Sequence, residues 1–112
     1  MFTYSRSHFR VAYPVGDRPK IRIAGVIGEV IDLSEKGVSF SVAAPQKMSE
    51  ADLSGVLLRA KIVFLDGSEE GIEGRVVRHT DPVIALTIEN TIPLARMMAE
   101  HRAIIQRYPT GP

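Results

Sequence analysis

Several short segments along the middle of the chain either alternate apolar with polar residues or are rich in β-branched residues. Val38, Phe40 and Val42 alternate with serines, which is the period-two pattern of a half-buried strand. Runs rich in Ile and Val predict further strands over residues 21–31, 56–65, 72–79 and 83–88. Turn residues separate these segments, so the pattern predicts successive strands in an antiparallel meander.

Glycines and short polar segments mark the bends between these strands. Gly25 and Gly28 lie inside the first Ile- and Val-rich run and indicate bulges or tight bends, as at barrel corners. Asp, Ser, Gly and Pro predict turns at residues 32–37, 66–68 and 80–82, and a longer connection with room for one helical turn at 43–54. Closing so many strands into a barrel removes the edges that they would otherwise expose, so the fold class is mainly β.

The pattern changes to helical spacing near the C-terminus. One helical stripe is formed by Leu94, Met97, Met98, Ile104, Ile105 and Tyr108. A helix is therefore predicted over 91–108, with Asn90 or Thr91 as its N-cap, Pro93 in its first turn and Pro109 at its end. The two methionines are expected to pack on the sheet rather than form an interaction surface.

Length and composition narrow the class of protein. The 112 residues suit one domain over 1–112, and 45% apolar with 24% charged residues is typical of a folded globular chain. Cysteine is absent, which excludes disulfides, a thiol nucleophile and a cysteine-based zinc site. No apolar run reaches the roughly 18 residues that a membrane span needs, and the polar N-terminus does not resemble a secretory signal.

Charge is unevenly distributed, although the net charge is only +1. Residues 1–22 carry five basic residues and one acidic residue, whereas residues 23–112 carry nine basic and twelve acidic ones. This asymmetry predicts a flexible basic arm at 1–12. The strand pattern predicts the barrel at 13–90, and the helical spacing predicts the helix at 91–108. The small net charge argues against nucleic-acid binding through bulk charge, and the arm is suited to closing over an anion.

Signatures of catalysis are lacking. The glycines form no phosphate-binding loop, and no G-x-S-x-G turn is present. His8, His79 and His101 lie far apart without metal-ligand spacing, and the pair Glu69 and Glu70 beside a turn is best explained as solvated charge. The sequence therefore predicts a protein that is not an enzyme, with no metal and no resident cofactor.

Two short motifs carry the binding chemistry. Arg6 and Arg10 form an R-x-x-x-R pattern in the basic arm, and Asp32, Ser34 and Gly37 form D-x-S-x-x-G about 22 residues later. An arginine fork matches phosphate oxygens and the O6 and N7 acceptors of guanine. A carboxylate accepts hydrogen bonds from the opposite guanine edge, and glycine lets the backbone approach a flat ligand. Together the motifs suit a guanine nucleotide with several phosphates.

The two motifs, in this order and spacing, resemble those of the PilZ domain, the bacterial receptor module for cyclic di-GMP. Gly74, Val76 and Arg78 are similar to the family's G-x-V-x-(R/W) strand, and the resemblance covers nearly the whole chain. It implies a six-stranded antiparallel split barrel with a C-terminal helix. It also implies a stand-alone, non-enzymatic receptor in the cytoplasm of a bacterium.

The resemblance implies a role for each matching residue. Arg6 and Arg10 would wrap the ligand and engage its phosphates and guanine edges, while Asp32 and Ser34 would hold guanine from the barrel surface. Gly37 would permit close approach, and Arg78 would stack on a base. Ser5 and Ser7 stand where several members have larger polar residues or a further Arg, so affinity is expected to be lower.

Three hypotheses about function follow. The leading one is a sensor whose arginine arm becomes ordered on cyclic di-GMP and which signals in trans to an effector protein. The alternative is a degenerate PilZ-type interaction adaptor that binds no nucleotide. A single-stranded nucleic-acid binder is disfavoured by the seven aromatic residues and the acidic body. The downstream partner, the ligand stoichiometry and the choice between monomer and homodimer stay open.

Overall fold

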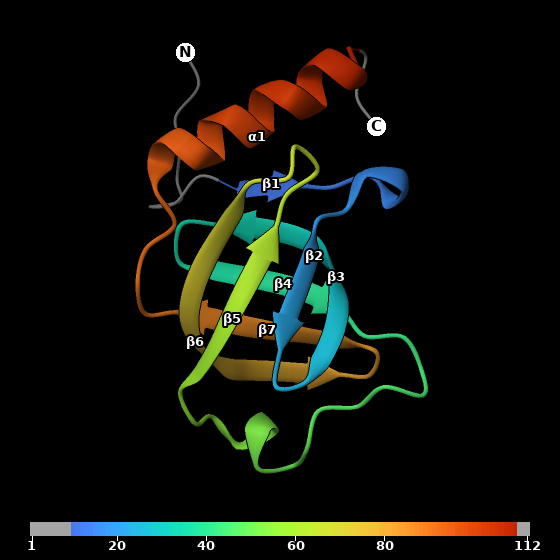
Figure 1. Ribbon diagram of the computed structural model, residues 1–112, viewed down its shortest axis with the longest axis vertical. Helices are drawn as coiled ribbons and strands as arrows, with labels where there is room; N and C mark the ends of the chain where they lie inside the picture. The colour runs from blue at the N-terminus through green and yellow to red at the C-terminus, as the bar shows by residue number, and fades with distance from the viewer. Residues whose placement is uncertain (1–9, 110–112) are drawn as a thin grey trace.

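The computed structural model describes residues 10–109, which form a closed β-barrel with a helix across one end (Figure 1). Six antiparallel strands, β2 to β7, make the barrel, and β1 is an extra strand that pairs with the C-terminal end of β3. The strands are β1 (Arg10–Ala12), β2 (Lys20–Ile23), β3 (Val26–Ser34), β4 (Gly37–Ser41), β5 (Leu58–Val63), β6 (Glu69–Thr80) and β7 (Val83–Ile88). Short 3-10 turns occur at Val15–Asp17 and Asp52–Ser54. The mainly-β prediction is confirmed.

The strands form two meanders rather than the single one predicted. β2, β3 and β4 pair in sequence, as do β5, β6 and β7. β4 does not pair with β5; the two meanders join instead through β2 with β5 and β4 with β7, all antiparallel. Because these two pairings close the sheet on itself, the barrel has no free edge among its six strands.

The predicted strand at 21–31 is wrong, because a tight hairpin turn divides it. Ala24 and Gly25 both have positive φ, 50° and 79°, which is the backbone that a two-residue turn between twisted strands requires. The turn joins β2 to β3. Ala-Gly is a weak turn signal, and the apolar residues on both sides made the segment resemble one continuous run.

Glycine at 28 has a packing role and does not form a bulge. A Cβ atom there would lie 2.7 Å from the carbonyl oxygen of Ser41 and 2.8 Å from the Phe40 ring. The bulges lie instead at Ile31 in β3 and Val77 in β6, where the register with the neighbouring strand shifts by one residue. Both come just before residues of the predicted binding motifs.

The core fills the barrel with inward residues of the strands, residues of the connecting segments such as Ile92, and one residue of the helix. Its largest fully buried side chains include Phe40, Ile21, Leu33, Ile62, Ile88, Ile92 and Met97. The helix α1 (Leu94–Arg107) contributes Met97, whereas Leu94, Met98 and Ile105 are about half exposed. The expectation that both methionines pack on the sheet therefore holds only for Met97.

The helix begins later than predicted and uses a different cap. Pro93 is the N-cap, and no side chain caps the first turn. The side chain of Asn90 instead accepts a hydrogen bond from the Glu73 amide at 2.6 Å and donates to the Gly71 carbonyl at 3.1 Å. Asn90 thus ties the end of β7 to β6. No helix within residues 10–109 is both long and apolar enough to cross a bilayer.

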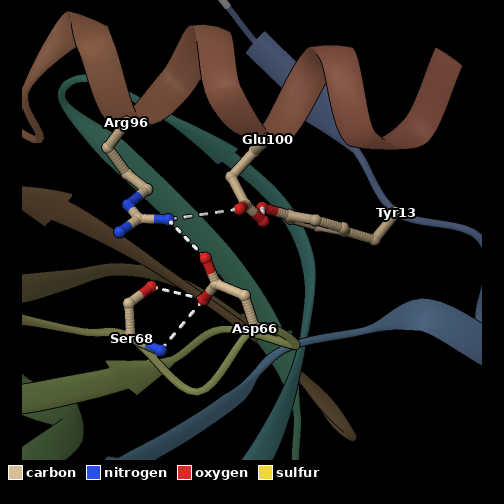
Figure 2. Close-up of polar contacts among 5 residues, drawn as sticks. All are labelled: Tyr13, Asp66, Ser68, Arg96 and Glu100. Atoms are coloured by element: carbon tan, nitrogen blue, oxygen red, sulfur yellow. Dashed lines mark hydrogen bonds and ion pairs between the residues drawn. The ribbon is translucent and has the colours of Figure 1, made fainter. Parts of the chain in front are cut away.

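Polar contacts fix α1 to the segment that follows β1. The Tyr13 hydroxyl donates to Glu100 at 2.8 Å, and Arg96 lies 3.5 Å from both Glu100 and Asp66 (Figure 2). Near the other end of the helix, Asp17 accepts hydrogen bonds from Arg107 and from the Tyr108 hydroxyl. Burial of Tyr13 raises the pKa of its phenol well above the ordinary value, and the Glu100 carboxylate raises it further.

Tyr13→Phe is expected to lower the free energy of unfolding by about 1–2 kcal/mol, because Glu100 loses a donor in a half-buried position. The raised pKa means that the fold favours the protonated phenol. The stabilisation that the protonated Tyr13 phenol gives to the fold is complete below about pH 10 and is lost as the pH rises above that value. Urea denaturation at pH 7 and at pH 10.5 measures both effects. The variant should lose less stability than the wild type between these two pH values, and an equal loss would contradict this assignment.

Candidate functional site

The bulge at Ile31 turns the D-x-S-x-x-G motif toward the outside of the barrel. Before it, Val26, Gly28 and Val30 point inward along β3. A regular strand would continue this alternation and bury Asp32 and Ser34. With the extra residue, Leu33 is fully buried and its two polar neighbours lie on the outer face, each partly exposed.

The bulge at Val77 does the same for Arg78. Val76 points into the core opposite Leu86, and Arg78 lies beyond the register shift, exposed and opposite Ala85. Because strand side chains alternate, a regular strand would direct residue 78 inward together with residue 76. Two bulges in two strands therefore place the motif residues Asp32, Ser34 and Arg78 on the outer face.

Strand register brings the candidate residues together in two neighbouring rows. A row here is a line of residues that lie directly opposite one another on successive strands. The first row crosses five strands through Ala12, Asp32, Ser39, Ala85 and Arg78. The small residues Ser39 and Ala85 lie between Asp32 and Arg78 in this row. Asp32 and Arg78 stand on strands three spacings apart, about 14 Å along the sheet.

The second row lies two residues further along and carries the rest of the motifs. It passes through Arg10, Ser34, Gly37, Thr87 and Arg75. Arg10 is directly opposite Ser34, so the second arginine of R-x-x-x-R lies beside the serine of D-x-S-x-x-G. Side chains directly opposite on one face lie close enough to bind a common group. Arg6 lies outside the described residues.

Three of the four charged side chains in these rows have no partner among residues 10–109. Across residues 10–109, the side chains of Arg10, Asp32 and Arg78 take part in no hydrogen bond or ion pair. Ser34 makes a single long hydrogen bond, 3.4 Å from Oγ to the Gly37 carbonyl. A half-buried carboxylate and two arginines on one face are thus available to a ligand.

Gly37 is required by neither backbone nor packing. The φ angle of Gly37 is not positive, so the backbone does not need a glycine here. A Cβ atom would make ordinary contacts of 3.4 Å with the Leu86 carbonyl oxygen and 3.5 Å with Ser34 Oγ. Only Glu35 and Lys36 form the turn between β3 and β4, so Asp32, Ser34 and Gly37 are strand residues rather than the turn residues that were predicted.

The hairpin that carries the motif is tied to the segment leading into α1. The amide of Ile88 donates to the Lys36 carbonyl at 2.8 Å, and that of Ile92 donates to the Glu35 carbonyl at 2.9 Å. Ile92 is fully buried just before the helix. A rearrangement of the motif hairpin would therefore act on the start of α1.

Arg75 is a residue of this surface that the motifs did not single out. It lies in the Arg10 row and is held by Glu89 at 3.7 Å and by the Gly55 carbonyl at 3.2 Å. Only the pairing of β6 with β7 shows that Arg75 belongs to this surface. Within residues 10–109, no cluster of three metal-ligating side chains occurs.

Comparison with known families agrees with this arrangement. The family model described as "PilZ domain" matches residues 4–107, almost the entire chain. The chain belongs to the PilZ domain family. PilZ domains are cyclic di-GMP-type receptors and adaptors, generally binding rather than catalytic domains. The resemblance inferred from the two motifs is thus confirmed.

Solved structures share the PilZ fold at low identity. The Bacillus subtilis inhibitor of motility (MotI/DgrA) aligns with 98% of this chain at 17% identity and a TM-score of 0.64, and the chain spans 54% of that protein. The PilZ domain of CeSA from a cellulose-synthesizing bacterium aligns with 88% of this chain and 97% of its own, at 20% identity and a TM-score of 0.51. No match occurs among curated proteins.

Proposed function

We propose that this PilZ domain is a non-enzymatic receptor for cyclic di-GMP that signals in trans to a partner protein. The observation that carries the proposal is the register of β1 on β3, which sets Arg10 opposite Ser34 and beside the row of Asp32. Residues far apart in sequence, one from each motif, thereby lie side by side. Arg10, Arg78 and Asp32, which have no side-chain partner among residues 10–109, match the phosphates and guanine edges of the ligand.

Each residue has a distinct part in this proposal. Asp32 accepts hydrogen bonds from the N1–H and exocyclic amine of guanine, and Arg10 engages phosphate oxygens or the O6 and N7 edge. Arg6 is proposed to act with Arg10, four residues before it in the chain. Arg78, about 14 Å from Asp32, is placed to meet a second base, of the same ligand or of a stacked partner.

Signalling follows from the contacts around the site. Ligand binding fixes the arm through its arginines, and an ordered arm presents a new surface to an effector. β1 continues directly into Tyr13, which holds Glu100 of α1, and the motif hairpin holds the segment before α1. The proposed setting is the cytoplasm of a bacterium.

A second candidate, an adaptor that binds a partner without nucleotide, is favoured by the exposed apolar residues of α1. Leu94, Met98 and Ile105 are 50%, 47% and 50% exposed. Calorimetry separates the candidates. Heat on adding cyclic di-GMP supports the receptor, whereas no heat together with partner binding that survives Arg6→Ala/Arg10→Ala supports the adaptor.

Gly37→Ala is expected to weaken cyclic di-GMP binding about tenfold while the free energy of unfolding changes by less than about 0.5 kcal/mol. The added methyl meets only ordinary contacts in the protein but occupies space beside Ser34. Calorimetry and urea denaturation measure the two effects. Unchanged affinity would mean that the ligand does not approach the backbone here.

A further inference from the structure

A second face of the barrel carries a ladder of cross-strand ion pairs. On the outer surface of β2, β3, β5 and the first half of β6, Lys20 lies opposite Glu29, with 2.9 Å between Nζ and Oε2. Arg59 lies opposite Glu73, with 3.4 Å between Nε and Oε2. In each of these rows the charge of the cation is matched by the residue facing it.

The row between them breaks this pattern. It runs through Ile27, Arg22, Lys61 and Gly71. Two cations face each other directly, an arrangement that destabilises a sheet. Lys61 forms an ion pair with Glu69 in the next row, 3.3 Å away, while the side chain of Arg22 makes no hydrogen bond or ion pair across residues 10–109. The position facing Lys61, where an acidic residue would complete the ladder, is Gly71.

Neither backbone nor packing explains this glycine. Gly71 does not have positive φ, and a Cβ atom added to it would meet nothing within 4 Å. A glycine inside a strand lowers stability relative to alanine. The missing side chain at Gly71 leaves a shallow hollow in the surface. It is lined by Arg22, Ala60, Lys61, Ile72 and the Arg59–Glu73 pair.

We propose that this surface, called here the Arg22–Gly71 row, binds an acidic side chain of a partner protein. Arg59 and Lys61 already form ion pairs with Glu73 and Glu69, so the local excess is one positive charge, on Arg22. One carboxylate neutralises that charge, whereas a nucleic acid needs many cations in line. The exposed side chain of Ile27, at the end of the row, supplies the apolar contact that a protein surface offers and a free anion does not.

The Arg22–Gly71 row lies away from the candidate nucleotide site. β2 and β5 form the near side of the barrel in Figure 1, with β4 and β7 behind them. Both nucleotide rows cross β4 and β7, and the strands that they share with the Arg22–Gly71 row are β3 and β6, where different residues belong to each. The barrel can therefore hold a partner on one side and a nucleotide on the other. This inference does not depend on the identity of the nucleotide.

The test uses two-dimensional amide NMR with a capped pentapeptide, Ala-Leu-Glu-Leu-Ala, as the probe. Its glutamine analogue and inorganic phosphate are the controls. The glutamate peptide at millimolar concentration is expected to shift the amides of Arg22, Ile27, Lys61 and Gly71 in a saturable way. The glutamine peptide and phosphate should shift them several-fold less.

Gly71→Glu supplies the missing carboxylate from within the chain. It should abolish the peptide-induced shifts and raise the thermal midpoint, while Gly71→Ala should retain the shifts. Arg22→Gln should lose them. Arg102→Gln, which removes an arginine of α1 that also has no partner among residues 10–109, should retain them. Cyclic di-GMP affinity should be unchanged in all four variants.

Three outcomes would overturn the inference. Equal shifts with the glutamine peptide would remove the role of the carboxylate. Equal or larger shifts with phosphate would assign the row to another anion. Shifts that persist in Gly71→Glu, while its spectrum shows a folded chain, would place the peptide elsewhere.

Discussion

Asp32→Asn is expected to weaken cyclic di-GMP binding by about 100-fold or more without lowering stability. In the proposed complex the carboxylate accepts two hydrogen bonds from one guanine edge, and a hydrogen bond to a charged group contributes about 1.5–3 kcal/mol. An amide keeps one acceptor and turns a donor toward the guanine donors. Asp32 has no partner across residues 10–109, so the fold does not depend on its charge.

Calorimetry measures the affinity and thermal denaturation measures the stability. Glu50→Gln is the matched control, because it removes an exposed carboxylate outside the two nucleotide rows. A variant at Asp32 that binds as tightly as the wild type would remove this residue from the site. A variant that loses both affinity and stability would point instead to a structural role.

Deletion of Ile31 is expected to abolish cooperative folding. Without the bulge residue, the alternation of β3 would turn Asp32 and Ser34 inward and Leu33 outward. Exposing Leu33 costs about 1.5–3 kcal/mol, and burying an unpaired carboxylate costs several more. The total approaches the whole stability of a small domain, about 5–15 kcal/mol.

Urea denaturation followed by circular dichroism checks this result. Ile31→Val, which keeps the residue count and an apolar side chain, should unfold with nearly the wild-type midpoint. If the deletion variant shows a wild-type transition, the bulge does not set the orientation of the motif.

Much of the fold could be predicted because the spacing of apolar residues within each segment matches the strand or helix that the segment forms. Serines alternating with Val38, Phe40 and Val42 specify a half-buried strand, and the structure has β4 there. The helix follows from its periodic apolar positions. The division at Ala24 and Gly25 was missed because an Ala-Gly turn leaves little trace between two apolar runs. The closure of the barrel depends on pairings between β2 and β5 that no local pattern specifies.

The sequence could indicate which residues belong to the candidate site, but it could not show that they lie together on one face of the barrel. The two motifs identified Arg10, Asp32 and Ser34 through the chemistry of their side chains. Their adjacency depends on the register of β1 on β3, and their outward direction depends on an extra residue at Ile31 that resembles any other apolar residue in the sequence. Arg75 was missed for the same reason, since only the register with β7 places it in the row of Arg10.

Calorimetry with cyclic di-GMP tests the central claim most directly, with GTP as the control ligand. The wild type is expected to bind cyclic di-GMP with micromolar or tighter affinity and GTP far more weakly, and Arg6→Ala/Arg10→Ala should lose the binding. The fitted stoichiometry then tells whether one ligand or a stacked pair occupies the two rows. Absence of heat and of any thermal shift with several hundred micromolar ligand would contradict the receptor assignment and leave the adaptor as the function of this PilZ domain.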